Sequence, residues 1–104
     1  MVVDKATRRT FRKTLEDKLR VAASNNQGLI VSWELSRSFD RVAIVCHEAT
    51  FRARVIDHLA TSLTRLLGVG KRLDLVERDL RALEVECFPE TGGDALLRRV
   101  YNVE

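Results

Sequence analysis

The sequence predicts an all-α protein: a long helical hairpin and a shorter third helix, dimerising into an antiparallel four-helix bundle. Apolar residues recur at alternating steps of three and four over most of the chain, which is the period of an amphipathic helix. Only 1 proline interrupts the 104 residues, and 45% hydrophobic with 32% charged residues is typical of a soluble, folded protein. We expect one domain over residues 1–87 and a tail, frayed or briefly helical, over residues 88–104.

The first helix is expected from about residue 4 to residue 25. Phe11, Leu15, Leu19 and Ala22 form one apolar stripe along it. The segment SNNQG at residues 24–28 ends it, because Asn and Gly tolerate the left-handed conformation of a helix C-cap.

The central segment allows two interpretations. GLIVSWEL at residues 28–35 and RVAIVCHEA at residues 41–49 contain β-branched runs that could form strands. We favour one helix from about residue 32 to residue 67, roughly 50 Å long at 1.5 Å per residue, because a helical seam crosses it without Gly or Pro. That seam, the expected core and dimer contact, comprises Phe39, Val42, Cys46, Ala49, Ala53, Ile56, Ala60 and Leu63 and continues to Leu67.

GVGK at residues 68–71 is expected to break this helix, and a third helix follows from about residue 71 to residue 85. In the tail, Asp94 is a candidate N-cap for one or two further turns. A hairpin alone buries little surface in so short a chain, so we expect a second copy to cover it. Packing of the third helix back over the hairpin is the alternative.

The net charge of +3 is unevenly distributed. Residues 1–67 contain 12 Lys or Arg against 7 Asp or Glu, a balance of +5, whereas residues 68–104 contain 6 against 8, a balance of −2. A basic portion of this kind favours nucleic acid or another anionic surface as a partner, although a solvated basic face is equally common.

The sequence also predicts several absences. No run of about 18 apolar residues and no signal peptide is found, so we expect a cytoplasmic protein that does not insert into membranes. Cys46 and Cys87 form no Cys-x-x-Cys motif, so reduced, buried thiols are expected. No phosphate-binding glycine loop, metalloprotease motif or nucleophile elbow is present. We therefore expect no enzyme activity, cofactor, metal site or small-molecule substrate.

Two rows of basic side chains accompany the seam of the expected central helix. One row comprises His47, Arg54, His58, Thr61 and Arg65, and the adjacent row comprises Arg37, Arg41 and Arg52. Planar guanidinium groups match phosphate oxygens, and a long row suits repeating phosphates better than a compact carboxylate ligand. The sequence offers no aromatic platform for unstacked bases, which disfavours binding of single strands.

Residues 11–67 resemble the small RNA-silencing suppressors of insect nodaviruses. TLEDKLRVAASNNQG at residues 14–28 is similar to that family's first helix, RSFDRV at residues 37–42 to the start of its second, and ARVIDHL at residues 53–59 to its arginine-containing segment. The resemblance implies an all-helical antiparallel dimer that lies along double-stranded RNA and shields it from host dicing and loading. In one register Arg54 takes the place of an RNA-contacting arginine and His47 that of a contacting lysine.

The sequence-based prediction is thus a homodimer that binds double-stranded RNA without sequence preference and suppresses RNA silencing in the host cytoplasm. The expected RNA contacts are Arg37, Arg41, His47, Arg52, Arg54, His58 and Arg65. Two alternatives stay open. One is a helical DNA-binding regulator or antitoxin that uses LLGVGKRLDLVERDL, residues 66–80, as a turn and recognition helix. The other is a protein-interaction module without a nucleic-acid partner.

Overall fold

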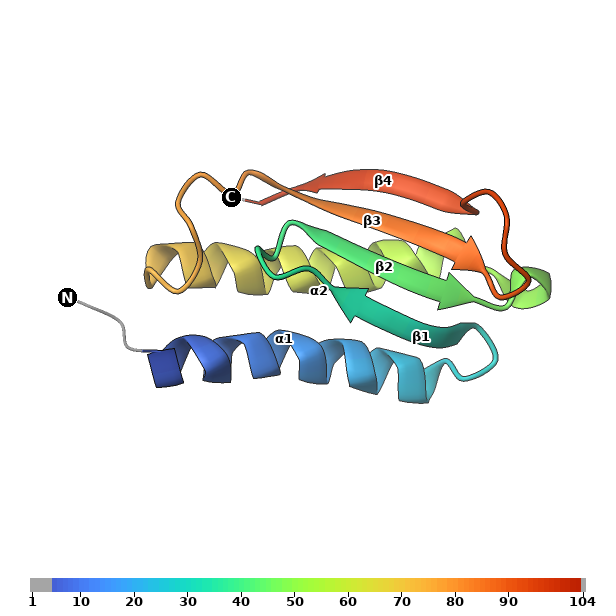
Figure 1. The fold of residues 1–104 in the computed structure, drawn as a ribbon, viewed down its shortest axis with the longest axis horizontal. Coiled ribbons are helices and arrows are strands. Elements are labelled where there is room, and N and C mark those ends of the chain that lie inside the picture. The colour runs from blue at the N-terminus through green and yellow to red at the C-terminus, as the bar shows by residue number, and fades with distance from the viewer. Residues whose placement is uncertain (1–4, 104) are drawn as a thin grey trace.

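The computed structural model describes residues 5–103, and its architecture is a two-layer α/β fold (Figure 1). A four-stranded mixed sheet packs against two helices, so the all-α prediction and its four-helix bundle are wrong. The elements are α1 (Lys5–Asn25), β1 (Ile30–Leu35), β2 (Arg41–Cys46), a short 3-10 turn (Glu48–Thr50), α2 (Ala53–Arg72), β3 (Ala82–Pro89) and β4 (Leu97–Asn102).

The first helix is confirmed as α1. Its predicted stripe faces the interior, where Phe11, Leu15 and Leu19 are buried. The side-chain amide of Asn26 donates a hydrogen bond to the carbonyl of Ala22 (2.8 Å) and so satisfies one of the open carbonyls at the end of the helix. The predicted first residue, Asp4, lies outside the described residues.

The predicted helix over residues 32–67 is wrong in its first half, which forms the β1–β2 hairpin. Phe39 has a φ of +64°, a left-handed conformation that no helix passes through. The hydroxyl of Ser36 accepts hydrogen bonds from the backbone N–H groups of Asp40 (3.1 Å) and Arg41 (3.0 Å), which closes the turn. Val42 and Cys46 suit both interpretations, because a step of four is one helical turn and also two strand periods.

The second half of that prediction is confirmed and extended. Helix α2 continues through Gly68 and Gly70 to Arg72, so the expected break comes too early. Gly70 is needed where it lies, because a Cβ there would come within 2.4 Å of the ring of Phe11. The predicted third helix and the frayed tail are also wrong: after Asp74, at φ +59°, the chain loops into β3 and then β4.

The sheet has the order β1-β2-β3-β4. The two outer pairs are antiparallel hairpins, and the central pair, β2 and β3, is parallel. Parallel neighbours need a crossover, and α2 supplies it. Helix α1 contacts β1, α2 contacts β3 and β4, and the helices contact each other, so both cover one face. Within residues 5–103, no element covers the other face, here called the open face.

The core lies between the helices and the central strands. Of the predicted seam, Val42, Cys46, Ile56, Ala60 and Leu63 are buried inside the single chain, whereas Phe39 is partly buried. Ala53 is half-buried and Ala49 is exposed at the 3-10 turn. The seam therefore builds the core of one chain, and its buried members are not available to a second copy.

Replacement of Gly70 by alanine should destabilise the protein. The new Cβ would overlap the ring of Phe11 and lie 2.9 Å from Val76, both of them buried. We expect the free energy of unfolding in urea to fall by about 1–2 kcal/mol, since overpacking exceeds the roughly 1 kcal/mol gained in helix propensity. Gly28→Ala is the control: nothing lies within 4 Å of its Cβ position, and its stability should be nearly unchanged. Equal effects of the two substitutions would contradict this packing.

The two cysteines should be unreactive in the folded protein. Cys46 and Cys87 are free and fully buried, as the sequence predicts. A hydrogen bond between their thiols and burial raise the pKa of Cys87, while the same bond lowers the pKa of Cys46. Burial nevertheless keeps both sulfurs from solvent, so we expect no reaction with Ellman's reagent until denaturant is added, and then two thiols. A thiol that reacts at once in buffer would place one cysteine at the surface.

Candidate nucleic-acid interface

The outward side of α2 carries a line of basic residues. At 100° per residue, Arg54, His58, Arg65 and Arg72 fall within about 60° of one another, opposite the buried Ile56. All four are exposed. From Arg54 to Arg72 the line is about 27 Å long at 1.5 Å per residue. We call these four residues the α2 row.

The α2 row is not neutralised by the protein itself. No ion pair joins any of its members to an acidic side chain within residues 5–103. Thr61 lies on the same side of the helix, and its hydroxyl donates to the carbonyl of Asp57 (2.9 Å). The three arginines of the row therefore leave unpaired positive charge along this side of α2.

Asp57 is the one acidic residue of α2, and two residues of β4 hold its carboxylate. Nη1 of Arg99 on β4 lies 2.7 Å and 2.6 Å from its two carboxylate oxygens, and the hydroxyl of Tyr101 donates a hydrogen bond to it. These bonds, with that of Tyr101 the largest cause, hold the pKa of Asp57 below its ordinary value. The carboxylate therefore stays ionised, and Arg99 offsets its charge beside the α2 row.

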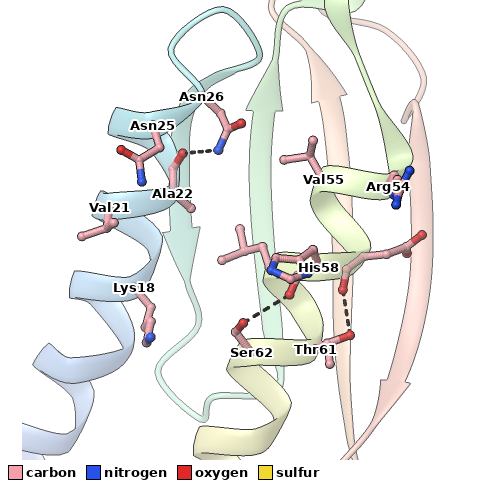
Figure 2. Close-up of a pocket in the computed structure, with 12 residues that line it drawn as sticks. Lys18, Val21, Ala22, Asn25, Asn26, Arg54, Val55, His58, Thr61 and Ser62 are labelled. Carbon is pink, nitrogen blue, oxygen red and sulfur yellow. Dashed lines mark hydrogen bonds between the residues drawn. The ribbon is translucent and has the colours of Figure 1, made fainter.

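A groove of about 660 Å³ lies between α1 and the N-terminal half of α2 (Figure 2). Figure 2 shows Lys18 and Val21 on the α1 side and Val55 and His58 on the α2 side. Its lining is mainly apolar, and Val21 is 56% exposed. Lys18 makes no ion pair within residues 5–103, so the groove adds a cation to the N-terminal end of the α2 row.

A second hollow, of about 400 Å³, lies at the C-terminal end of α2. Arg65 and Arg72 border it, together with Thr64 and Asn102, and no acidic residue lines it. Two guanidinium groups beside hydroxyl and amide groups can bind phosphate oxygens, because each guanidinium presents a planar fork of donors. This hollow is the most suitable phosphate site along the row.

The structure divides the seven predicted RNA contacts. Arg54, His58 and Arg65 lie together on α2, with Arg52 just before the helix. Arg37 lies in the β1–β2 turn, at the end of the sheet away from the N-terminus of α2 and Arg54. Arg41 forms an ion pair with Glu86 on the open face, and His47 contacts Glu90. The second predicted row, which depended on a continuous helix, therefore does not exist.

Arg72 is a member of the row that the sequence-based prediction missed. The expected helix stopped at residue 67, although Arg72 follows Arg65 by seven residues, which is two helical turns. That spacing is visible in the sequence, but GVGK was interpreted as the end of the helix, so Arg72 was left out of the predicted row.

Another basic cluster, near the N-terminal end of α1, is less suited to a polyanion. Arg8, Arg9 and Arg37 border a hollow there, but Asp74 and Glu77 line the adjoining one. Arg12 is committed to the fold, since it donates hydrogen bonds to the carbonyls of Leu35 (2.7 Å) and Ser36 (3.0 Å).

Comparisons with known proteins found no match to a family model, to a curated protein or to a solved structure. Neither helix of the described chain is both long and apolar enough to cross a membrane. Residues 5–103 contain no group of three or more His, Cys, Asp or Glu side chains placed to hold a metal ion.

The tyrosine hydroxyl provides a direct test of the contact with Asp57. Burial and the bonded carboxylate raise the pKa of Tyr101 to about 12. Because the chain has 1 Tyr, absorbance at 295 nm reports this group alone. We expect ionisation near pH 12, and a lower pKa in Asp57→Asn because the anion is lost. Since the folded pKa exceeds the unfolded one, stability should fall as pH rises from about 10 to 12. A pKa near 10 in the folded wild type would contradict the contact.

Proposed function

We propose that the protein binds double-stranded RNA without sequence preference, through phosphate contacts made by the α2 row and Lys18. The observation that carries the proposal is the α2 row itself: three exposed arginines and a histidine along about 27 Å of one helix, with no acidic partner within residues 5–103. A solvated face usually mixes both signs of charge. Here the acid of the helix, Asp57, is held by Arg99 and Tyr101, which leaves the row wholly basic.

The position of α2, packed beside α1 on one face of the sheet, favours contacts with a duplex backbone over readout of bases. The end of the helix that extends past the strands in Figure 1 continues directly into the loop before β3, so neither end is free to enter a groove as a reading element. Double-stranded RNA offers a wide, shallow minor groove bordered by phosphates and 2′-hydroxyls, and shape decides its recognition. Trp33 and Tyr101 pack against the core and do not provide a stacking platform.

The competing roles fare differently. Residues 66–80, the expected turn and recognition helix of a DNA-binding regulator, are the end of α2 and the loop before β3, so they contain no separate helix that could enter a groove. The all-helical fold implied by the resemblance to nodavirus suppressors is contradicted by the four-stranded sheet, so shielding of RNA from silencing would have to follow from RNA binding alone. The remaining alternative, a protein-interaction module without a nucleic-acid partner, is distinguished from RNA binding by the gel-shift panel described next.

Loss of two cations from the row should weaken RNA binding selectively. We expect Arg65→Gln with Arg72→Gln to raise the dissociation constant for a duplex RNA by about tenfold or more in a gel shift, since each arginine loses a charge-assisted contact. The matched control is Arg78→Gln with Arg81→Gln, which removes the same charge from two exposed residues of the α2–β3 loop. Duplex DNA and single-stranded RNA complete the panel.

The outcomes of this panel distinguish an RNA-specific binder from a general duplex binder and from an interaction module. Equal binding of RNA and DNA duplexes would replace the RNA proposal with a general duplex binder. Equal losses in the two double variants would show that net charge, and not the α2 row, governs binding. No binding to any of the three nucleic acids by the wild type would leave the interaction module.

Salt dependence tests the mechanism separately. If Lys18, Arg54, Arg65 and Arg72 each neutralise one phosphate, log K should fall against log salt with a slope of about −3.5, by analogy with duplex DNA. The double variant at positions 65 and 72 should reduce the slope by about 2. A slope near zero would refute phosphate binding.

A further inference from the structure

The open face of the sheet has the anatomy of a protein interface. The apolar residues on it are Ala43, Val45, Phe88 and Val100. Each lies between two residues of its strand that face the helices, so its own side chain is directed to the open face. Val100 is 65% exposed. Four charged residues lie among these apolar ones: Glu34, Arg41, Glu84 and Arg98. The face therefore combines apolar contact area with charged side chains, and the arrangement of those charges decides which surface can pack against it.

A buried carboxylate lies in the middle of this face. Glu86 is 2% exposed although no helix covers it, and it forms ion pairs with Arg41 and Arg98. Arg98 donates a hydrogen bond to Oε2 (2.9 Å), and the guanidinium of Arg41 lies against Oε1, so each carboxylate oxygen contacts one arginine. A buried ion pair rarely adds net stability, and its best-attested role is to fix the register of an association.

We infer that the open face is the interface between two copies of this chain, packed sheet against sheet. The pattern of charge is what identifies the occupant. One row across the sheet runs Glu34, Ala43, Glu86, Arg98, and the next runs Arg41, Glu84, Val100. In the first row, Glu34 on the edge strand β1 and Arg98 on the edge strand β4 have opposite charges. In the second row, Arg41 on β2 and Glu84 on β3 have opposite charges.

A two-fold axis parallel to the strands makes this pattern complementary to itself. Such an axis places β1 over the β4 of the second copy and β2 over its β3. Glu34 then faces a second Arg98, and Arg41 faces a second Glu84, so both rows meet opposite charges. Val45 meets a second Phe88 in the row between β2 and β3. Aligned packing of two sheets in this manner is a common architecture.

The size of the face sets the strength of the association. Four strands of six residues or so cover about 20 by 20 Å, less than the roughly 800 Å² per partner of a standard interface. The dimer is therefore a weak, reversible one. It leaves the α2 row uncovered, because the helices lie on the other side of the sheet.

Sedimentation equilibrium of the full chain, without nucleic acid, tests this interface. The wild type should show a reversible monomer–dimer equilibrium at micromolar concentrations. Val100→Lys and Val45→Lys should each raise the dimer dissociation constant by about tenfold or more, with an unchanged far-ultraviolet circular dichroism spectrum. Val21→Lys is the matched control, because it adds the same charge at an exposed valine in the groove on the helix side.

Three results would overturn the inference. The first is a wild type that stays monomeric at several hundred micromolar. The second is weakening by Val21→Lys and not by Val100→Lys, which would move the contact to the helix side. The third is weakening by Val100→Lys alone: Val45 lies on an inner strand, so its tolerance would indicate pairing through the edge of β4.

The proposed axis is tested by Glu34→Lys. This substitution brings a cationic side chain on β1 of one copy against Arg98 of the other, and we expect the dissociation constant to rise at least threefold. If the copies instead packed with β1 over β1, the change would exchange one pair of like charges for another and leave the constant unaltered. An unaltered constant would therefore overturn the arrangement with β1 over β4.

Discussion

The parallel pairing of β2 with β3 is the constraint on which the rest of the structure depends. Val42, Ile44 and Cys46 on β2 and Val85 and Cys87 on β3 are at most 1% exposed and form the centre of the sheet. Parallel neighbours require a crossover that covers them, and this sets the place of α2. Because α2 must turn Ile56, Leu63 and Leu67 toward these strands, its remaining side, with the basic residues, is directed outward.

The two faces of the molecule differ in how they use arginine. On the open face, Arg41 and Arg98 are bound to Glu86, and on β4, Arg99 is bound to Asp57. On the outer side of α2, the cations have no acidic partner within the described chain. Net charge alone does not distinguish these situations. What matters for a polyanion is the charge left over after internal pairing, and that remainder lies on the helix side.

The helices could be predicted from the sequence where the apolar residues fit a helical period and not the alternation of a strand. Phe11, Leu15 and Leu19 are spaced three and four apart in a polar context, and they predict α1 correctly. Val42 and Cys46 fit a strand as well as a helix, and length was a poor arbiter because a turn of ordinary residues, SRSFD, separated two strands without Gly or Pro. The positive φ of Phe39 has no counterpart in its side chain that a pattern could detect. Likewise the expected third helix, residues 71–85, took in Leu83, although Leu83, Val85 and Cys87 alternate as in a buried strand.

The site was predicted only as far as the helix was. Arg54, His58 and Arg65 needed nothing beyond helical geometry, whereas the roles of Arg41 and His47 depended on partners distant in sequence, Glu86 and Glu90. One consequence follows from the placement of both helices on a single face. If the α2 row binds duplexes as proposed, a chain of this one-sided shape coats a duplex and does not encircle it. Two such chains joined through their open faces would then have a valency of two, with their α2 rows directed apart, and would bridge separate duplexes into a condensed network.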